Sequence, residues 1–311
     1  MHIGIAGEVR CVVTNADGTV KTDTGFQKNL ILNQGLDFFG GGRGSTINAI
    51  CAIGSGNSTP TITQNKLDSF IALTVASDTT TDFSYKDDGD NLYKMWQQRK
   101  YRFANLDSAN ISEVGLVSTG STSTDYYLTT RALIKDSTGE PTSISVKTGE
   151  TLDIYYKIHK VVDTRDKEFI INMLDGNGAS IPYNATHRPV YVGANSWNTP
   201  TNSVVIPNDV FYSLNDISSI TAYPSRINLG DPSVTMSSYV IGSYKIVMTF
   251  FFPLNVATTG IRTIFSLDSF RFLPFQIRFG SVENDSMIDK NNKNTLTIPL
   301  EFSWGRYEGE L

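Results

Sequence analysis

The sequence predicts a mainly β protein of two β-sandwich-like domains, the first with two short helices covering one side of its sheet. Three observations lead to this class. Ser, Thr, Asn and Gly are abundant while Ala and Leu are not, which favours strands and turns over long helices. Short runs of β-branched and aromatic residues recur between polar turn signals, as in β-sandwiches. The 311 residues are enough for two ordinary domains.

The first element expected is a β-hairpin within residues 4–31. Glu8–Val13 is a strand rich in β-branched residues, and Asn15–Gly18 is a turn with Gly at its end, as type I turns prefer. Leu32, Leu36 and Phe39 then recur at helical spacing. They predict a first short helix, which ends at the glycines 40–42.

The stretch from residue 47 to residue 73 predicts a strand, a Gly-rich turn and a second short helix. Ile47–Ile53 is an apolar run typical of a buried strand, and residues 54–60 break it with Gly and Pro. Thr61 and Gln64 have the spacing of a capping box. Leu67, Phe70 and Ile71 follow at i, i+3 and i+4, so we expect a helix with one apolar stripe.

A Gly-rich turn between a strand and a helix is also found at phosphate sites. Here no Lys-Ser/Thr pair follows Gly56, as a P-loop requires, and no third Gly opens the helix, as in a dinucleotide fingerprint. We therefore interpret Gly54-Ser-Gly56 as a packing device and expect no cofactor there.

Two segments of the first half allow a functional and a structural interpretation. Asp87, Asp88 and Asp90 could hold Ca²⁺, but they lack EF-hand spacing, so a solvated loop is the favoured interpretation. Leu92–Phe103 alternates aromatic and basic residues towards its end. This pattern suits single-stranded nucleic acid, or a strand with one aromatic face in the core and one charged face in water. We favour the strand, because no other basic patch supports nucleic-acid binding.

Three more strands are expected before residue 163, at 111–116, 126–134 and 152–162. Glu113 and Arg131 lie in neighbouring strand signals. They predict a cross-strand ion pair, which contributes ~0.2–1 kcal/mol if it is exposed.

The charged run Asp163–Glu168 predicts a linker between a domain of residues 1–163 and a second, β-rich domain of residues 164–311. The order of the later strand signals resembles the first half and suggests a degenerate duplicate. The strands expected in the second domain are Pro189–Val192, Val204–Ile206, Ile217–Tyr223, Tyr244–Phe252, Ile261–Leu267, Pro274–Gly280 and Thr295–Trp304.

Charge and composition disfavour several functions. The net charge of −5 is the opposite of that of most nucleic-acid binders, so sequence-specific nucleic acid is not expected. No run approaches the ~20 apolar residues of a membrane helix. Cys11 and Cys51 suit free buried thiols, and no Cys/His cluster indicates a metal. His159 is expected on an exposed strand face and His187 in a loop, and neither adjoins a Ser or Cys nucleophile motif, so we expect no enzyme.

Four segments of the chain resemble structural proteins of tailed bacteriophages, from tail-fibre, collar and tail-tip assemblies. The segments are KNLILNQGLD, ICAIGSGNSTPTITQNKLDSFIAL, ISEVGL and TTRALI, within residues 25–162. In that group an xGxG(N/S)xxPxxxxxxL turn–helix precedes an (I/V)xE(I/V)GL strand and an xRA strand. The residues that match the turn–helix are Gly54, Gly56, Pro60 and Leu67.

The resemblance implies a virion component of the tail or neck, assembled in the host bacterial cytoplasm. Its expected partners are copies of itself and other virion proteins, such as portal or adaptor, tail or fibre proteins. The alternative is a receptor-binding tail protein that grips host-surface glycan. Aromatic rings stack on sugars, and the candidates are Trp197, Tyr212 and Tyr223, which otherwise suit core or interface anchors.

Overall fold

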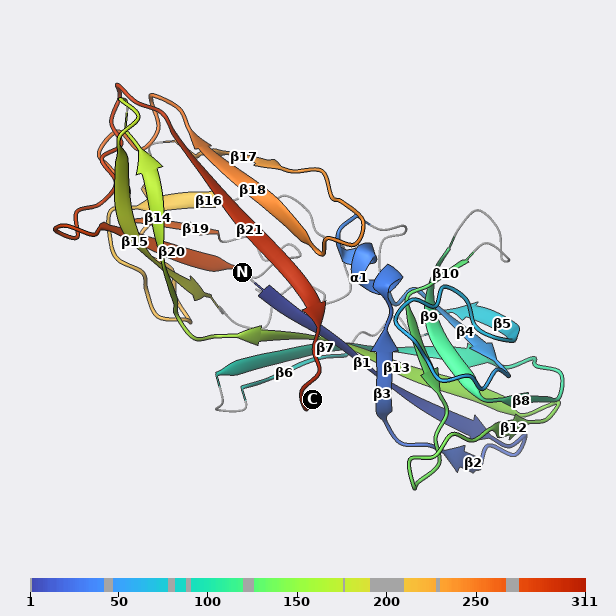
Figure 1. The fold of residues 1–311 in the computed structure, drawn as a ribbon. Helices are drawn as coiled ribbons and strands as arrows, with labels where there is room; N and C mark the ends of the chain where they lie inside the picture. The colour runs from blue at the N-terminus through green and yellow to red at the C-terminus, as the bar shows by residue number, and fades with distance from the viewer. Residues whose placement is uncertain are drawn as a thin grey trace.

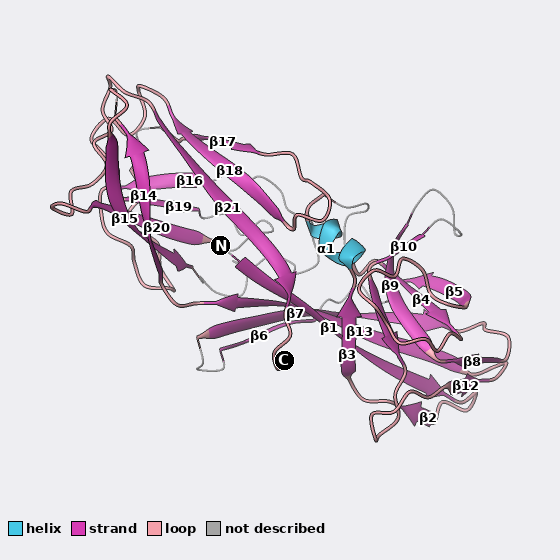
Figure 2. Cartoon of the chain, viewed as in Figure 1, coloured by secondary structure: helices cyan, strands magenta, loops and turns pink. Residues whose placement is uncertain are grey.

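The computed structural model describes residues 2–41, 47–77, 82–87, 91–119, 126–175, 177–190, 210–227, 230–266 and 274–311. Over this part of the chain the protein is mainly β, as predicted, with one α-helix (Figure 2). The strands gather into two lobes joined by a long ribbon (Figure 1).

The first lobe and the ribbon contain thirteen strands and helix α1 among the described residues. They are β1 (His2–Thr14), β2 (Val20–Asp23), β3 (Gln27–Ile31), α1 (Asn33–Phe39), β4 (Ile50–Gly54), β5 (Phe70–Val75), β6 (Asp82–Asp87), β7 (Leu92–Phe103), β8 (Ala109–Ile111), β9 (Glu113–Thr119), β10 (Tyr126–Leu128), β11 (Thr130–Leu133), β12 (Ile144–Val146) and β13 (Thr151–Asp163).

The second lobe contains β14 (Lys167–Leu174), β15 (Ser180–Pro189), β16 (Val210–Ser213), β17 (Ser233–Met236), β18 (Lys245–Phe252), β19 (Thr263–Ser266), β20 (Phe275–Ser281) and β21 (Leu296–Arg306). One of its layers is the five-stranded sheet β14-β15-β20-β19-β16, and the other is formed by β17, β18 and β21. Phe275 of the first layer packs against Phe250 and Phe302 of the second, with ring centroids 6.1 and 5.6 Å apart. These aromatic contacts place the core of the lobe between its two layers.

The ribbon consists of β1, β13 and β7, which pair antiparallel along most of their length. On β7, Tyr101 and Phe103 are buried, whereas Lys100 and Arg102 are partly or fully exposed on the other face. This alternation confirms the interpretation of Leu92–Phe103 as a strand with an aromatic core face and a charged outer face.

The two lobes also meet at α1, which forms as the spacing of Leu32, Leu36 and Phe39 predicts. The Trp304 indole N–H of the second lobe donates to the Leu36 carbonyl at 2.8 Å, and Tyr239 stacks on Trp304. The Asp37 carboxylate accepts hydrogen bonds from the Tyr239 hydroxyl and the Gly242 N–H. The helix therefore lies at the junction of the lobes (Figure 1).

The second predicted helix, over residues 61–73, is wrong. Residues 61–69 form a short turn followed by bends and irregular backbone, and Phe70–Val75 is strand β5, which pairs with β4. The predicted stripe does not exist, because Leu67 is buried whereas Phe70 is exposed. The capping-box contact itself forms, since the Thr61 N–H donates to Gln64 Oε1 at 2.8 Å, but no helix follows it.

A strand predicted at Ile217–Tyr223 is also absent, because side chains of the adjoining sheet satisfy the backbone of this segment. Gln276 accepts from the Ser218 N–H and donates to the Ser218 and Ser219 carbonyls. Val204–Ile206 and the end of Pro189–Val192 lie outside the described residues.

His187 was expected in a loop, but it lies in β15 and is 6% exposed. Its ring stacks on Phe275, and neither ring nitrogen has a hydrogen-bond partner among the described residues. Burial is the main cause that lowers the pKa of His187 to about 3, with a smaller contribution from the positive charge of Lys167 and an opposing one from Asp166. The native state therefore holds a neutral imidazole over a wide pH range.

This burial predicts a loss of stability in acid. The unfolded chain binds a proton at His187 below an ordinary pKa of about 6.5, whereas the folded chain does so only near pH 3, so the contribution is present above pH 6.5 and is lost as the pH falls. Between pH 7 and pH 5, wild type should lose about 2 kcal/mol of unfolding free energy that His187→Phe does not lose. Urea unfolding at both values measures this difference, and equal losses in the two proteins would contradict it.

Candidate functional site

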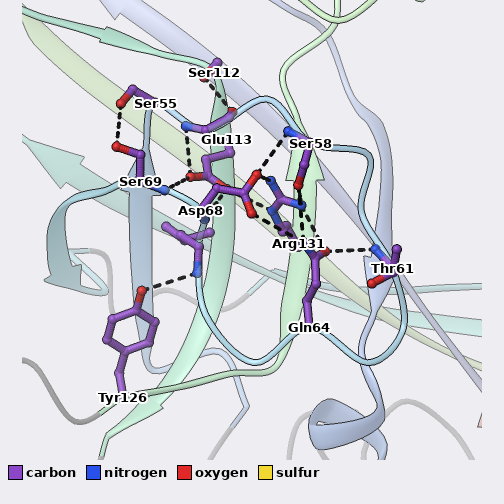
Figure 3. A network of polar contacts seen from close by, with 12 residues as sticks. Ser55, Ser58, Thr61, Gln64, Asp68, Ser69, Ser112, Glu113, Tyr126 and Arg131 are labelled. Atoms are coloured by element: carbon purple, nitrogen blue, oxygen red, sulfur yellow. Dashed lines mark hydrogen bonds and ion pairs between the residues drawn. The ribbon is translucent and has the colours of Figure 1, made fainter.

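The two glycines that match the turn–helix lie against a carboxylate of the protein itself. Strand β4 ends at Gly54, and the chain then turns across the side chain of Glu113 on β9 (Figure 3). A Cβ atom on Gly54 or on Gly56 would lie 2.5 Å from Glu113 Oε1. Glycine is required at both positions because the backbone passes so close to this oxygen.

Glu113 is fully buried and its carboxylate is saturated with hydrogen bonds. Oε1 accepts from the N–H groups of Gly56 at 3.0 Å and Ser69 at 2.8 Å. Oε2 accepts from the Asp68 N–H at 3.2 Å and from Arg131 Nε at 2.8 Å. Three of the four donors are backbone groups of the segment 54–69, so the carboxylate fixes the path of that segment.

Arg131 of β11 is the charge partner of Glu113, and it is fully buried as well. Its remaining nitrogens donate to Ser58 Oγ at 3.3 Å, to Gln64 Oε1 at 2.9 Å and to Asp68 Oδ2 at 2.7 Å. The guanidinium therefore contacts the segment 54–69 at three points while it pairs with β9 (Figure 3). The predicted cross-strand ion pair is confirmed, but it is buried rather than exposed.

Asp68 completes the network from its solvent side. Its carboxylate accepts from the Ser58 N–H at 3.0 Å as well as from Arg131. Burial raises the pKa of Asp68, but the hydrogen bonds from Ser58 and the positive charge of Arg131 outweigh burial and lower it overall. Asp68 therefore stays ionised, and Arg131 donates a second charge-assisted hydrogen bond to its carboxylate.

The network explains why residues 61–69 are not helical. The Gln64 side-chain oxygen accepts a hydrogen bond from Arg131, and the N–H groups of Asp68 and Ser69 donate to Glu113. A helix would require these N–H groups to bond to carbonyls one turn earlier. Side-chain partners compete with the helix and prevail here because they satisfy two buried charges.

Leu67 and Pro60, the other two residues of the matched motif, lie beside the network rather than in it. Leu67 is buried in a small apolar cluster with Leu32, Ala52, Val117, Tyr126 and Leu128. Pro60 lies beside an open groove of about 620 Å³, whose other walls include Lys28, Lys135 and the segment 306–309. The groove adjoins the network, but every nitrogen of Arg131 donates to a residue of the network.

The aromatic residues predicted for glycan binding do not form a surface cluster among the described residues. Tyr212 is fully buried, packs on Phe252 and accepts the Ala257 N–H, so its ring is not available to a sugar. Tyr223 is half-buried against Phe265, and burial raises its pKa to about 12. Trp197 lies outside the described residues.

Other predicted sites are only partly covered by the structure. The backbone of Asp87 ends β6, whereas Asp88 and Asp90 lie outside the described residues. Within the described ranges no three His, Cys, Asp or Glu side chains are grouped to hold a metal. No described helix is long and apolar enough to cross a membrane. Cys11 and Cys51 are free and buried, as predicted.

Sequence reasoning identified Glu113, Arg131 and the glycines, but it missed Asp68, Ser58 and Gln64 as members of one network. The signal for Gln64 was present in its capping-box spacing, although that spacing was assigned to a helix. Comparison of the chain with protein-family models, with curated proteins and with solved structures gives no match.

The network predicts a large loss of stability when one charge is removed. Glu113→Gln leaves Arg131 buried without its charge partner, so the free energy of unfolding should fall by about 3–5 kcal/mol. Adding Arg131→Met to Glu113→Gln removes the orphaned charge, so the double variant should lose less than the two single losses combined. Urea unfolding of the four proteins measures this coupling.

The exposed pair Lys245–Glu301 is a matched control. Its atoms are also 2.8 Å apart, but its side chains are 52% and 53% exposed. Glu301→Gln should therefore change the unfolding free energy by less than about 1 kcal/mol. If Glu113→Gln lowered the free energy of unfolding as little as Glu301→Gln does, the buried pair would contribute no more to stability than an exposed pair. That result would contradict the prediction.

Proposed function

We propose that the chain is a non-enzymatic structural building block of a tailed-bacteriophage virion, located in the tail, the neck or collar, or a fibre-attachment complex. One observation carries the proposal. The four segments that resemble phage structural proteins, far apart in sequence, meet at the network around Glu113 and Arg131. Lys28–Asp37 joins it through the Asn33 N–H, which donates to the Ile62 carbonyl at 2.9 Å.

This convergence favours a structural function. The polar residues of the shared segments bond to one another inside the lobe, so the segments specify a rigid unit rather than a reactive surface. Glu113 and Arg131 are not accessible to a substrate, because both are fully buried and each makes four hydrogen bonds within the network. A protein organised in this way acts through the surfaces that its scaffold presents.

The finer architecture belongs to the same proposal. We interpret the two lobes as the two sandwich-like domains predicted from the sequence, with the boundary at the charged run Asp163–Glu168. In that run the bidentate pairs Asp163–Arg165 and Asp166–Arg188 stiffen the turn from β13 into β14. Whether the second domain is a degenerate duplicate of the first stays a prediction.

Exposed apolar side chains offer surfaces for contact with copies of the chain and with other virion proteins. Val240 and Ile241 lie on the loop between β17 and β18, where Ile241 is 83% exposed. The contacts of Asp37 with Tyr239 and Gly242 hold this loop in place. A rigidly held apolar loop is a suitable anchor for an interface.

Imaging and mass spectrometry of purified particles of the phage that encodes the chain test the proposal. The chain should be present in the particles, and density fitting the two lobes should lie at the tail base, the neck or a fibre attachment, repeated about a symmetry axis. Density only at the distal tip of an appendage would favour the receptor-binding alternative. Absence of the chain from particles would overturn both assignments.

A further inference from the structure

Among the described strands of the second lobe, β14 forms one edge of the five-stranded sheet. It pairs only with β15 among the described strands, and it stands at the end of the order β14-β15-β20-β19-β16 (Figure 1). The Asp175 N–H donates to the Ala179 carbonyl, so Asp175 and the odd-numbered residues of β14 bond towards β15. The N–H and C=O groups of Glu168, Ile170, Asn172 and Leu174 therefore point away from the sheet.

This edge lacks the features that normally protect one. Phe169–Leu174 contains no charge, no Pro and no break in its register with β15. Ile170 is 62% exposed and Leu174 is 73% exposed. A long, regular, apolar edge pairs readily with another strand, so we expect a partner to cover β14 in the working assembly.

The charged residues at the two ends of β14 favour antiparallel pairing with a second copy of the strand. Lys167 begins the strand on its odd-numbered face and Asp175 follows it on the same face, whereas Arg165 is paired with Asp163 in the turn before the strand. If a second β14 pairs antiparallel about a two-fold axis through Ile170, Lys167 of each copy lies opposite Met173 of the other and diagonal to Asp175, within reach of a long side chain. Parallel self-pairing would instead align Lys167 with Lys167 and Glu168 with Glu168, which is unfavourable.

The same register suits the rest of the strand. Ile170 then lies opposite Ile170 of the second copy, and Glu168 lies opposite Asn172, so no like charges meet. Both members of each of these pairs have outward backbone groups and can exchange two N–H···O bonds. The axis runs perpendicular to the sheet, so each face continues across the junction.

We propose that β14 is a homodimer interface, in which two copies join their five-stranded sheets by antiparallel pairing about Ile170. The inference rests on the self-assembly part of the proposed function and names the surface and the partner, a second copy of this chain. It concerns the isolated protein, so it can fail while the location of the chain in particles still holds.

Disulfide trapping with the full-length chain tests the register. Opposed residues in a hydrogen-bonded antiparallel pair have Cα atoms about 5.5 Å apart, within the range that a disulfide spans. Ile170→Cys should therefore cross-link to its own copy under mild oxidation. The native Cys11 and Cys51 do not interfere, because both are fully buried.

Leu174→Cys and Ile241→Cys are matched controls, since both side chains are more exposed than Ile170. In the proposed register the two Leu174 residues are eight strand positions apart, about 26 Å, which is too far for a disulfide. Cross-linking at Ile170 should exceed that of both controls at least tenfold. Equal rates at the three positions would mean random collision and would overturn the proposal.

Sedimentation velocity over a concentration series gives the second readout. Wild type should form a dimer, and Ile170→Lys, which places two ammonium groups opposite each other, should raise its dissociation constant at least tenfold. Ile170→Pro should do the same, because it removes an outward N–H that β15 does not use. Circular dichroism should show both variants folded. A monomeric wild type, or folded variants that still dimerise like wild type, would overturn the proposal.

Discussion

The first lobe depends on the burial of one ion pair. Moving a carboxylate and a guanidinium out of water is unfavourable by several kcal/mol per ion, and it is tolerated only where every hydrogen-bonding position is satisfied. Glu113 and Arg131 each make four hydrogen bonds, of which three join Glu113 to backbone N–H groups and three join Arg131 to side chains of residues 54–69. The two glycines, the missing helix and the ionised Asp68 all follow from that constraint.

The constraint extends from the network to the junction of the lobes. In the segment 54–69, the Ile62 carbonyl accepts a hydrogen bond from the Asn33 N–H, where α1 begins. Leu36 and Asp37 of α1 then contact Trp304 and Tyr239 of the second lobe. A chain of direct contacts therefore runs from the buried pair through α1 to β21. The turn at Gly54-Ser-Gly56, which the sequence predicts to be a packing device, thus belongs to a series of contacts that connects the two lobes.

The sequence predicts those features that local pattern controls. The strand at Glu8–Val13, the helix at Asn33–Phe39 and the two faces of β7 are all visible in alternation or helical spacing. The helix over 61–73 fails because long-range partners on β9 and β11 take its polar groups. The pairing of Glu113 with Arg131 could be predicted, but its burial could not, because burial depends on how the segment 54–69 folds over both. Tyr212 shows the same limit, since its burial depends on packing against Phe252.

Hydrogen exchange of three amides tests the central claim most directly. The N–H groups of Gly56, Asp68 and Ser69 lie outside strands, yet each donates to the buried carboxylate of Glu113. If the buried pair organises the lobe, these amides should exchange only through global unfolding, as slowly as the core amides of β9. Exchange as fast as that of the amides of the exposed residues Thr63 and Asn65 in the same segment would show that the segment opens independently and would contradict the account.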